Sequence, residues 1–326
     1  MHTKSSFFHC SAAIAAIALL FGGSPARAQS YPSQPIKIVV PTAPGGVADI
    51  AGRTFAQQLN EIGKTAVVEN RTGAGGAIAA DYVAKSAPDG YTVYVGFHAT
   101  QAILPHLQKL SYDADKDFSP ITIAVKSANI LVINPTLPAQ SLQELVAYAK
   151  ANPGKLTYAS QGNGSSGHIV AEQLKQVAGI DLIHVPYRGA APAVQDLIAG
   201  HVSTMFDILT LALPQVKAEK VRALAITTAQ RDALFPGVPT TAEVGFPQLE
   251  GGPWFGFFAP AKTPRPVVDW LHAEAKKAFS TPENRERFAQ QGLTTMLGTP
   301  GETAAFVAAE SKRWGEVIQR ANIRME

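Results

Sequence analysis

Hydrophobic positions along the chain fall into short apolar runs, and each of the first runs is followed by a stretch with helical spacing. The runs IKIVV, TAVVE and YTVYVG are rich in the β-branched and aromatic residues that favour strands. Within 47–62, apolar residues recur every three or four positions, which gives one stripe that can pack on a sheet. This alternation predicts βαβ units, and therefore a parallel sheet with helices on both faces.

A long apolar run at 121–134 leads into a second series of the same kind. We expect its helices at 141–151, 165–177, 190–199 and 209–217, and its strands at 156–160, 182–185, 203–206 and 223–227. After a loop rich in Pro and Gly, WFGFFAP resumes the strand pattern, and the remainder is helical. These last helices have no sheet of their own and must return to the first lobe. The prediction is two α/β lobes joined by two strands with a ligand cleft between them: 29–126 plus 255–326, and 127–254.

The N-terminus has the pattern of a secretory signal peptide. Lys4 and no acid precede an apolar stretch too short to span a bilayer, and Ala26-Arg27-Ala28 forms an A-x-A cleavage site. We therefore expect residues 1–28 to be removed. The sole cysteine, Cys10, leaves with them, so the 298-residue mature chain is predicted to have no disulfide and no thiolate.

Charge argues against a nucleic-acid partner. Removing Lys4 and Arg27 from the 28 basic residues leaves 26 against 25 acidic ones, a net charge of +1. A net charge this small gives no indication of the basic surface that nucleic-acid-binding proteins carry. Beyond the signal peptide no apolar run is long enough to cross a membrane, so we expect a soluble product outside the cytoplasm.

Two glycine-rich turns carry the first functional hint. PTAPGGVADIAGR and NRTGAGGAIAADYVAK each join a strand to a helix. Free backbone N–H groups and the helix dipole both favour an anion at such a position. In parallel sheets, ligands bind outside the carboxyl ends of the strands, where both turns lie.

Nucleotide and metal motifs fail on inspection. GAGGAI has Ile78 where a dinucleotide fingerprint needs Gly or Ala, and IGKT ends a helix where a P-loop would begin one. The histidines are dispersed and no paired-carboxylate spacing appears, so we expect no metal and no cofactor.

GNGSSGH, 162–168, places serines beside a histidine and invites a hydrolase interpretation. It lacks the G-x-S-x-G elbow, and no aspartate follows at a spacing that would orient His168. Ligand hydrogen bonding and helix capping are the other interpretations of this loop.

Several further loops are rich in N–H and hydroxyl donors, and they supply candidate ligand contacts at His98, Thr100 and Gln101. Arg188 could pair with a carboxylate or with a surface acid such as Asp196. Asp49 is unsuited to an anion site. We expect it to brace the first loop through backbone N–H groups, or to accept from a ligand amine or hydroxyl.

The ordered series of YPSQPIKIVVPTAPGGVADIAGR, VENRTGAGGAIAADYVAKSAPDGYTVYVG, YDADKDFSPI, LTYASQGNGSSGHI, VPYRGAAPAVQDLIAGHV, MFD, VRALAITT and PWFGFFAP resembles the Bug family, the periplasmic receptors of tripartite tricarboxylate transporters. The similarity runs from Tyr31 to the C-terminus. It implies a type II periplasmic-binding-protein fold that closes two lobes over the ligand. The resemblance also implies a ligand site in both lobes. It assigns the grip on one carboxylate to Ala43, Gly45, Gly46, Asp49, Ala74, Gly75 and Gly76, and the second lobe's contacts to Ser160, Gly164, Ser165, Ser166, His168 and Asp207.

The interpretation is a periplasmic receptor, not an enzyme and expected to be a monomer, that captures a mono- or dicarboxylate and passes it to membrane transporter subunits of the TctA and TctB kind. Two alternatives remain: an exported serine esterase using Ser165 or Ser166 with His168, and a sensory receptor that presents a bound carboxylate to a membrane kinase.

Overall fold

The computed structural model describes residues 31–324, so the signal peptide predicted at 1–28 lies outside the described residues. The chain from Gln34 onward forms one compact unit that contains two β-sheets. Among the described helices, none combines the length and the apolar character that a membrane span needs.

The first sheet has six strands in the order β11-β4-β10-β3-β1-β2. Their bounds are β1 (Ile36–Val40), β2 (Ala66–Asn70), β3 (Thr92–Phe97), β4 (Phe118–Lys126), β10 (Trp254–Pro260) and β11 (Thr294–Thr295). Strand β1 pairs in parallel with β2 and β3, as the βαβ pattern predicts. Strands β10, β4 and β11 add in antiparallel fashion, so the expectation of an all-parallel sheet is wrong for this half of the sheet.

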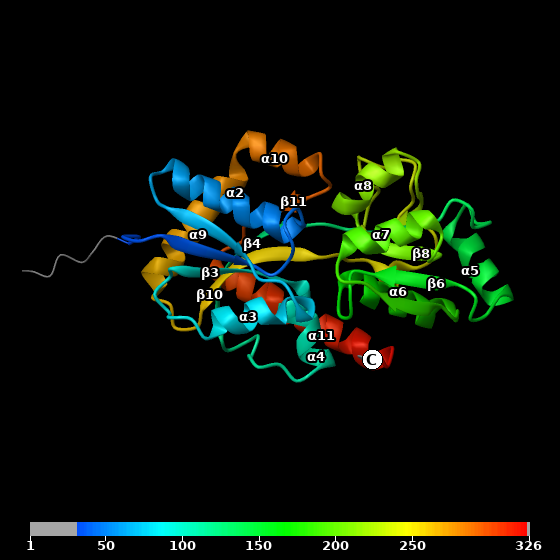
Figure 1. Cartoon of the computed structure of the whole chain (residues 1–326), viewed down its shortest axis with the longest axis horizontal. Helices are drawn as coiled ribbons and strands as arrows, with labels where there is room; N and C mark the ends of the chain where they lie inside the picture. The colour runs from blue at the N-terminus through cyan, green and yellow to red at the C-terminus, as the bar shows by residue number, and fades with distance from the viewer. Residues whose placement is uncertain (1–30, 325–326) are drawn as a thin grey trace, which may run out of the picture. The chain divides into compact units, whose positions relative to one another are not determined.

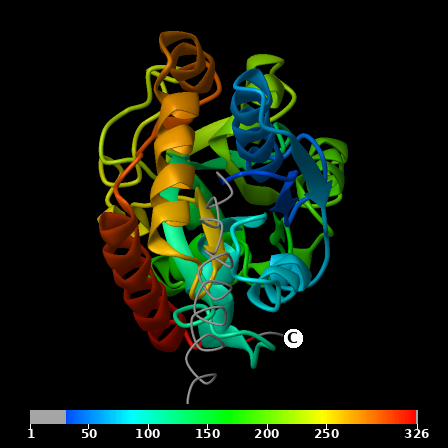
Figure 2. The same ribbon diagram turned by 90° about the vertical axis from the view of Figure 1, so that its left-hand side faces the viewer.

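Helices cover both faces of the six-stranded sheet (Figures 1 and 2). One face carries α2 (Val47–Glu61), α9 (Arg265–Ser280) and α10 (Pro282–Ala289); the other carries α3 (Ala77–Ala84), α4 (Leu104–Leu107) and α11 (Pro300–Arg320). On the first face the Phe257 ring lies 4.7 Å from Phe55 and 5.8 Å from Phe279. These buried rings fix α2 and α9 on the sheet, since large aromatic side chains dominate core energetics.

The second sheet has five strands in the order β7-β6-β8-β5-β9. Their bounds are β5 (Asn129–Ile133), β6 (Thr157–Ser160), β7 (Ile183–Pro186), β8 (Thr204–Ile208) and β9 (Arg222–Ile226). Leu131 packs with α5 (Leu142–Ala151) and α6 (Ser166–Ala178), whereas Ile130 and Val132 pack with α7 (Ala190–Ala199) and α8 (Leu209–Lys217). This alternation is the period of two that places successive side chains on opposite faces.

The apolar run at 121–134 contains parts of two strands. Strand β4 belongs to the six-stranded sheet and β5 to the five-stranded one, with Ser127 and Ala128 between them. The chain returns between β9 and β10, and the Ser127 amide donates to the Pro253 carbonyl at 2.8 Å. Two segments therefore link the sheets and are bonded to each other.

Strand directions bring the loops of interest to one edge of each sheet. Strands β1, β2 and β3 are parallel, so their carboxyl ends share an edge. The carboxyl ends of β6 and β8 share an edge with the start of β5, because β5 runs antiparallel to β8. Three short helical turns complete the structure, namely η1 (Ala74–Gly76), η2 (Ala99–Ile103) and η3 (Pro247–Leu249).

Candidate functional site

Asp49 braces the loop between β1 and α2 and is itself only 2% exposed. Its Oδ2 atom accepts from the Gly45 amide at 2.9 Å and from Arg53 Nε at 2.8 Å. Its Oδ1 atom accepts from Asn70 Nδ2 at 2.9 Å, and the same amide group donates to the Thr42 carbonyl. Of the two roles expected for Asp49, the structure has the bracing one.

These contacts also decide the charge of Asp49. Burial alone would raise the pKa of this carboxyl, but hydrogen bonds from Arg53, Gly45 and Asn70 outweigh burial and hold the pKa below its usual range. Asp49 is therefore ionised at neutral pH. Because Asn70 ends β2 and Asp49 lies in the first turn of α2, this carboxylate links the two glycine-rich loops.

Helices α2 and α3 both begin without a side-chain cap. Their N-cap residues are Gly46 and Gly76, and neither helix start has a side-chain acceptor. Amides in the first turn of a helix have no intrahelical acceptor, and the dipole adds partial positive charge there. Two such termini follow neighbouring strands, which favours an anion beside both.

The predicted residues of these loops differ in what they can offer a ligand. Ala43, Ala74 and Gly75 are exposed, whereas Gly76 is buried, with its amide donating to the Gly73 carbonyl at 2.9 Å. The Gly45 amide is taken by Asp49. Gly75 has φ of 63°, a left-handed conformation that glycine adopts without strain.

Three predicted residues follow β3, where the chain forms the π-helical turn η2. Such turns are rare and occur frequently at functional sites. Thr100 Oγ1 accepts from the Tyr94 hydroxyl at 2.9 Å, so this hydroxyl group serves the core. The Gln101 side chain is fully buried, and its amide has no hydrogen-bond partner among the described residues. Burial lowers the pKa of His98 to about 3 against a weaker opposing effect of the Trp254 main chain, so the ring is neutral.

On the five-stranded sheet, polar side chains form the edge. Ser165 caps α6 by accepting from the His168 amide, and Ser166 Oγ donates to Asn129 Oδ1 at 2.8 Å. Ser160 Oγ lies 2.7 Å from His184 Nε2. The His168 ring accepts from the Gly164 amide through Nδ1 at 3.1 Å.

The hydroxyl groups expected for the esterase alternative do not meet the His168 ring. This ring stacks on His184 with centroids 4.3 Å apart, while Ser165 bonds the His168 main chain and Ser166 bonds Asn129. Burial lowers the pKa of both histidines to about 4, which leaves them neutral at pH 7. The loop is arranged for capping and bracing.

Asp207 is the buried acid of this edge. Its Oδ1 accepts from Gln161 Nε2 at 2.7 Å and from the Ile208 amide at 2.8 Å. Its Oδ2 and Gln161 Oε1 are buried without a donor among the described residues. Burial raises the pKa of Asp207 to about 7, and the two hydrogen bonds only partly oppose this.

Loops from the two sheets come into contact at the predicted site. A Cβ atom on Gly75 would lie 3.6 Å from the Asn163 carbonyl oxygen, and one on Gly164 would lie 2.7 Å from Leu104 Cδ2. The glycine loop before α3 thus faces the loop before α6. The loop that carries Arg188 also joins this group, because the Tyr187 and Gly189 amides donate to the Ser160 and Gln161 carbonyls at 3.1 and 3.2 Å.

Arg188 lies on the exposed surface, and none of the ion pairs among residues 31–324 includes it. Asp196, its expected surface partner, instead accepts from the Tyr187 hydroxyl at 2.6 Å and contacts His201. The ion pair with Asp196 considered for Arg188 is therefore not formed, and pairing with a ligand carboxylate stays a prediction.

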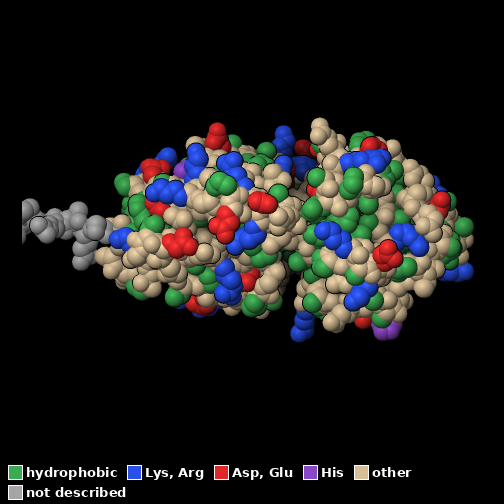
Figure 3. All heavy atoms as spheres, turned by 90° about the horizontal axis from the view of Figure 1, so that it is seen from above, with side chains coloured by type: hydrophobic (Ala, Val, Ile, Leu, Met, Phe, Trp, Pro, Cys, Tyr) green, Lys and Arg blue, Asp and Glu red, His purple; other side chains and the backbone are tan. Residues whose placement is uncertain are grey.

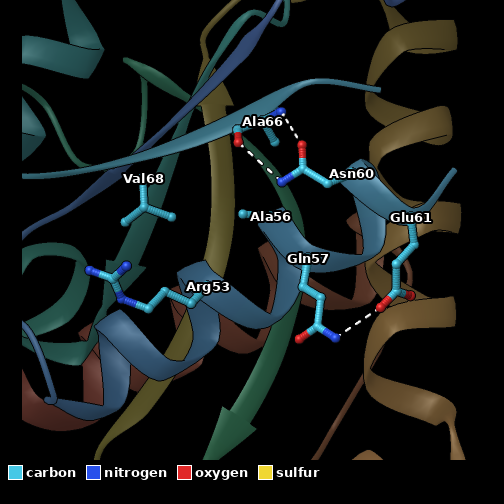
Figure 4. A pocket seen from close by; sticks show the side chains of 7 residues that line it. All are labelled: Arg53, Ala56, Gln57, Asn60, Glu61, Ala66 and Val68. Carbon is cyan, nitrogen blue, oxygen red and sulfur yellow. Dashed lines mark hydrogen bonds between the residues drawn. The ribbon is translucent and has the colours of Figure 1, made fainter. Parts of the chain in front are cut away.

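A hollow of about 630 Å³ lies away from these loops, between α2 and the edge strand β2 (Figure 4). Its polar groups pair with one another: Asn60 bonds both main-chain groups of Ala66, and Gln57 donates to Glu61. Arg53 at its rim is bonded to Asp49. The hollow therefore offers a ligand few free polar partners.

No buried cation balances the site. The buried charged side chains of the described residues are Asp49, Asp207 and Glu274, without a lysine or arginine. On the outer face that Figure 3 shows, basic and acidic side chains are interspersed. The described residues contain no group of three potential metal-ligating side chains.

Residues 51–323 match the model of the protein family described as the tripartite tricarboxylate transporter family receptor. The chain belongs to this family. BugT of Bordetella pertussis is 35% identical over 306 residues, which are 93% of this chain and 94% of BugT. The resemblance to the Bug receptors is confirmed.

Solved structures of the family agree in fold. The R. palustris protein Rpa4515 with adipate is 34% identical with a TM-score of 0.86, covering 90% of this chain and 99% of that one. MatC of Rhodopseudomonas palustris with bound malate is 34% identical with a TM-score of 0.83, covering 88% and 100%. The predicted periplasmic-binding-protein fold is therefore confirmed, and this family member is a solute-binding receptor by descent and architecture.

Three polar residues of the site were missed as candidates. Asn70 and Gln161 lay inside quoted loops, but Asn129 was hidden within the apolar run 121–134. Its signal is positional: Asn129 is a polar residue where a buried strand begins, directly after the chain leaves the first sheet.

Proposed function

We propose that this family member is a periplasmic receptor for a small mono- or dicarboxylate, which it binds between the edges of its two sheets. The observation that carries the proposal is the pair of uncapped helix starts at Gly46 and Gly76, on neighbouring loops joined through Asn70 and Asp49. Such termini stabilise a carboxylate without a cation. The adipate and malate held by two relatives support this ligand class.

The proposed contacts divide between the sheets. Ala43, Gly46, Ala74 and Gly75 hold one carboxylate through main-chain N–H groups, and Asp49 keeps the loops in place. From the other sheet, Ser160, Ser166 and Asp207 face the rest of the ligand, with His168 positioning Gly164. Gln101 and His98 line the side formed by η2.

Binding is proposed to shift the population toward a closed form. Residues 29–126 with 255–326 form one moving lobe and 127–254 the other, hinged at the two bonded crossings. A ligand that contacts both lobes stabilises the closed form by the difference in its affinity for the two states. Closure then presents the ligand to membrane subunits of the TctA and TctB kind. We further propose cleavage after Ala28 and export to the periplasm as a monomer.

A thermal-shift screen against organic acids tests the proposal, because binding to the folded state raises the melting temperature by mass action. We expect a rise of several degrees with at least one carboxylate, followed by stoichiometric binding in calorimetry. A panel of mono-, di- and tricarboxylates without any shift would contradict the proposal. Ester substrates are included as a control, and turnover that disappears in Ser165→Ala or Ser166→Ala would favour the esterase instead.

A further inference from the structure

The edge of the five-stranded sheet carries two buried hydrogen-bond acceptors that have no donor among the described residues. Gln161 uses its Nε2 to donate to Asp207 Oδ1, which leaves Gln161 Oε1 as an acceptor only. Asp207 Oδ1 receives two hydrogen bonds, whereas Asp207 Oδ2 receives none. Buried polar atoms are nearly always paired, so two unpaired acceptors on bonded side chains point to a donor supplied from outside the protein.

The position of this pair fits a ligand contact. Asp207 lies one residue before the end of β8, and Gln161 directly follows β6, on the edge that faces the glycine loops. A Cβ on Gly167 would lie 2.2 Å from the Phe206 carbonyl and 3.0 Å from Gln161 Oε1. Only glycine lets α6 approach β8 closely enough to hold both acceptors at this edge.

We propose that Asp207 and Gln161 form a donor-selecting subsite, so that the preferred ligand is an amino- or hydroxycarboxylic acid whose N–H or O–H group is received by Asp207 Oδ2 and Gln161 Oε1. The inference rests on the proposed function, since the glycine loops must hold the carboxylate. A second carboxylate at this position would bring another acceptor to an acid and would bind only if a proton were shared between them.

Asp207 has no charged neighbour that could substitute for a ligand donor. Burial and the bonds from Gln161 and Ile208 are the causes that set its pKa near 7. Strands β5 and β6 flank β8, and helices α6, α7 and α8 pack against it. Their ionisable groups are engaged elsewhere, neutral at pH 7 or at the far end of a helix: Tyr158, His168, Glu172, Lys175, Asp196 and Lys217. Whether affinity rises or falls with pH therefore shows whether the ligand brings an ammonium group or a second carboxylate to Asp207.

Calorimetry on matched acids tests the subsite. The probes are butyrate, 2-aminobutyrate, 4-aminobutyrate, 4-hydroxybutyrate and succinate, with their five-carbon homologues. We expect an amino or hydroxy member to bind at least about tenfold tighter than the unsubstituted acid. Asp207→Asn retains an oxygen for Gln161 and Ile208 but replaces the free acceptor by a donor, so this preference should vanish. Asp181→Asn, at an exposed position before β7, is the control that removes an equal charge.

The pH profile gives a second readout that needs no variant to fold. An ammonium group prefers ionised Asp207, so affinity should rise by roughly tenfold or more from pH 5.5 to pH 8, because Asp207 ionises near 7. Succinate and glutarate should show the opposite sign. Tighter binding of the dicarboxylates, or a donor preference that survives in Asp207→Asn, would overturn the inference. If no carboxylate binds at all, the result would instead contradict the proposed function.

Discussion

Helices α2 and α3 begin at glycines that offer no side-chain acceptor, whereas α6 begins at Ser165, whose hydroxyl group caps it. All three follow strands at an edge that faces the other sheet. The Gly46 and Gly76 amides donate to the Ala43 and Gly73 carbonyls, so the N–H groups left for an anion lie further into each first turn, whereas at α6 a side chain already satisfies one such donor. The first sheet therefore contributes main-chain donors, and the second contributes side-chain acceptors and hydroxyl groups.

This difference separates two tasks of one site. Main-chain N–H groups recognise any carboxylate, because they contact a group that all such ligands share. The printed side-chain bonds of Asp207, Gln161 and Asn129 lie within the second sheet and its loops, and none of them reaches the first loops. The proposed function thus places affinity for the class and selection within the class on different sheets, and substitutions on each side should produce different losses.

Gly75→Pro should have the largest effect. Proline fixes φ near −65° and removes the N–H, whereas Gly75 has φ of 63° in an exposed loop. Loss of a charge-assisted hydrogen bond is worth about 1.5–3 kcal/mol, and the loop must also rearrange. We expect calorimetry to show binding weakened by at least about a hundredfold for every carboxylate.

Gly63→Pro is the matched control for this change. Gly63 also has a positive φ, of 71°, but lies at the end of α2 with no atom near its Cβ position. The Gly63→Pro variant should be less stable than wild type but should bind carboxylates with the same affinity. Unchanged affinity in Gly75→Pro would show that this loop does not hold the carboxylate.

Gly46→Pro should also abolish binding, because it removes the amide at the start of α2.

Gly164→Ala tests whether the two sheets must approach. Its Cβ would lie 2.7 Å from Leu104 Cδ2, and its φ of 76° disfavours alanine. We expect affinity to fall by roughly tenfold, which corresponds to about 1.4 kcal/mol. In the double variant with Leu104→Ala, the contact is relieved and part of the affinity returns. Strict additivity in this double-mutant cycle would show that the contact is irrelevant to binding.

The sequence predicts most elements because their local signals agree. Helices α7 and α8 and strand β10 have the expected bounds, since Pro, Gly and apolar spacing all mark them. The direction of β4 and β10 was not predictable, because antiparallel pairing depends on how distant segments meet. The apolar pattern also runs through Ser127, because both β4 and β5 are largely buried, so periodicity alone does not mark where one strand ends and the other begins.

The site divides in the same way. The glycine loops are visible in sequence because positive φ and free N–H groups require glycine. The pairing of Gln161 with Asp207 joins residues 46 positions apart and depends on β6 lying beside β8, which no local pattern specifies. Arg188 illustrates the converse, because it is a charged residue in a quoted motif that the fold leaves exposed.

Asp49→Asn should lower stability and, through the loops, affinity. The change removes an acceptor shared by Gly45 and Arg53, and an unsatisfied buried group costs about 1–3 kcal/mol. The folded pKa of Asp49 is depressed, so its contribution is present above the ordinary aspartate value near 4 and is lost as pH falls below it. The stability gap between wild type and variant should therefore shrink in acid, as denaturant titrations at pH 7 and pH 3 would show.

Asp269→Asn provides the control, since Arg265 and Asp269 form an exposed helical pair with the same spacing. Its effect should stay within about 0.5 kcal/mol. Equal losses for the two variants would mean that Asp49 forms an ordinary surface pair and does not brace the loops.

Ser165→Ala should have the smallest effect and be confined to the second sheet. Losing the cap of α6 costs about 0.5–2 kcal/mol of stability. Because the first loops do not depend on Ser165, we expect affinity for a carboxylate to change less than threefold, and the measurement is a melting curve with calorimetry on the same sample. Ser165→Asn, which restores a capping oxygen, should recover the stability. A loss of affinity in Ser165→Ala that Asn does not rescue would mean that this hydroxyl group touches the ligand, and that the division of tasks between the two sheets is less strict than their helix starts indicate.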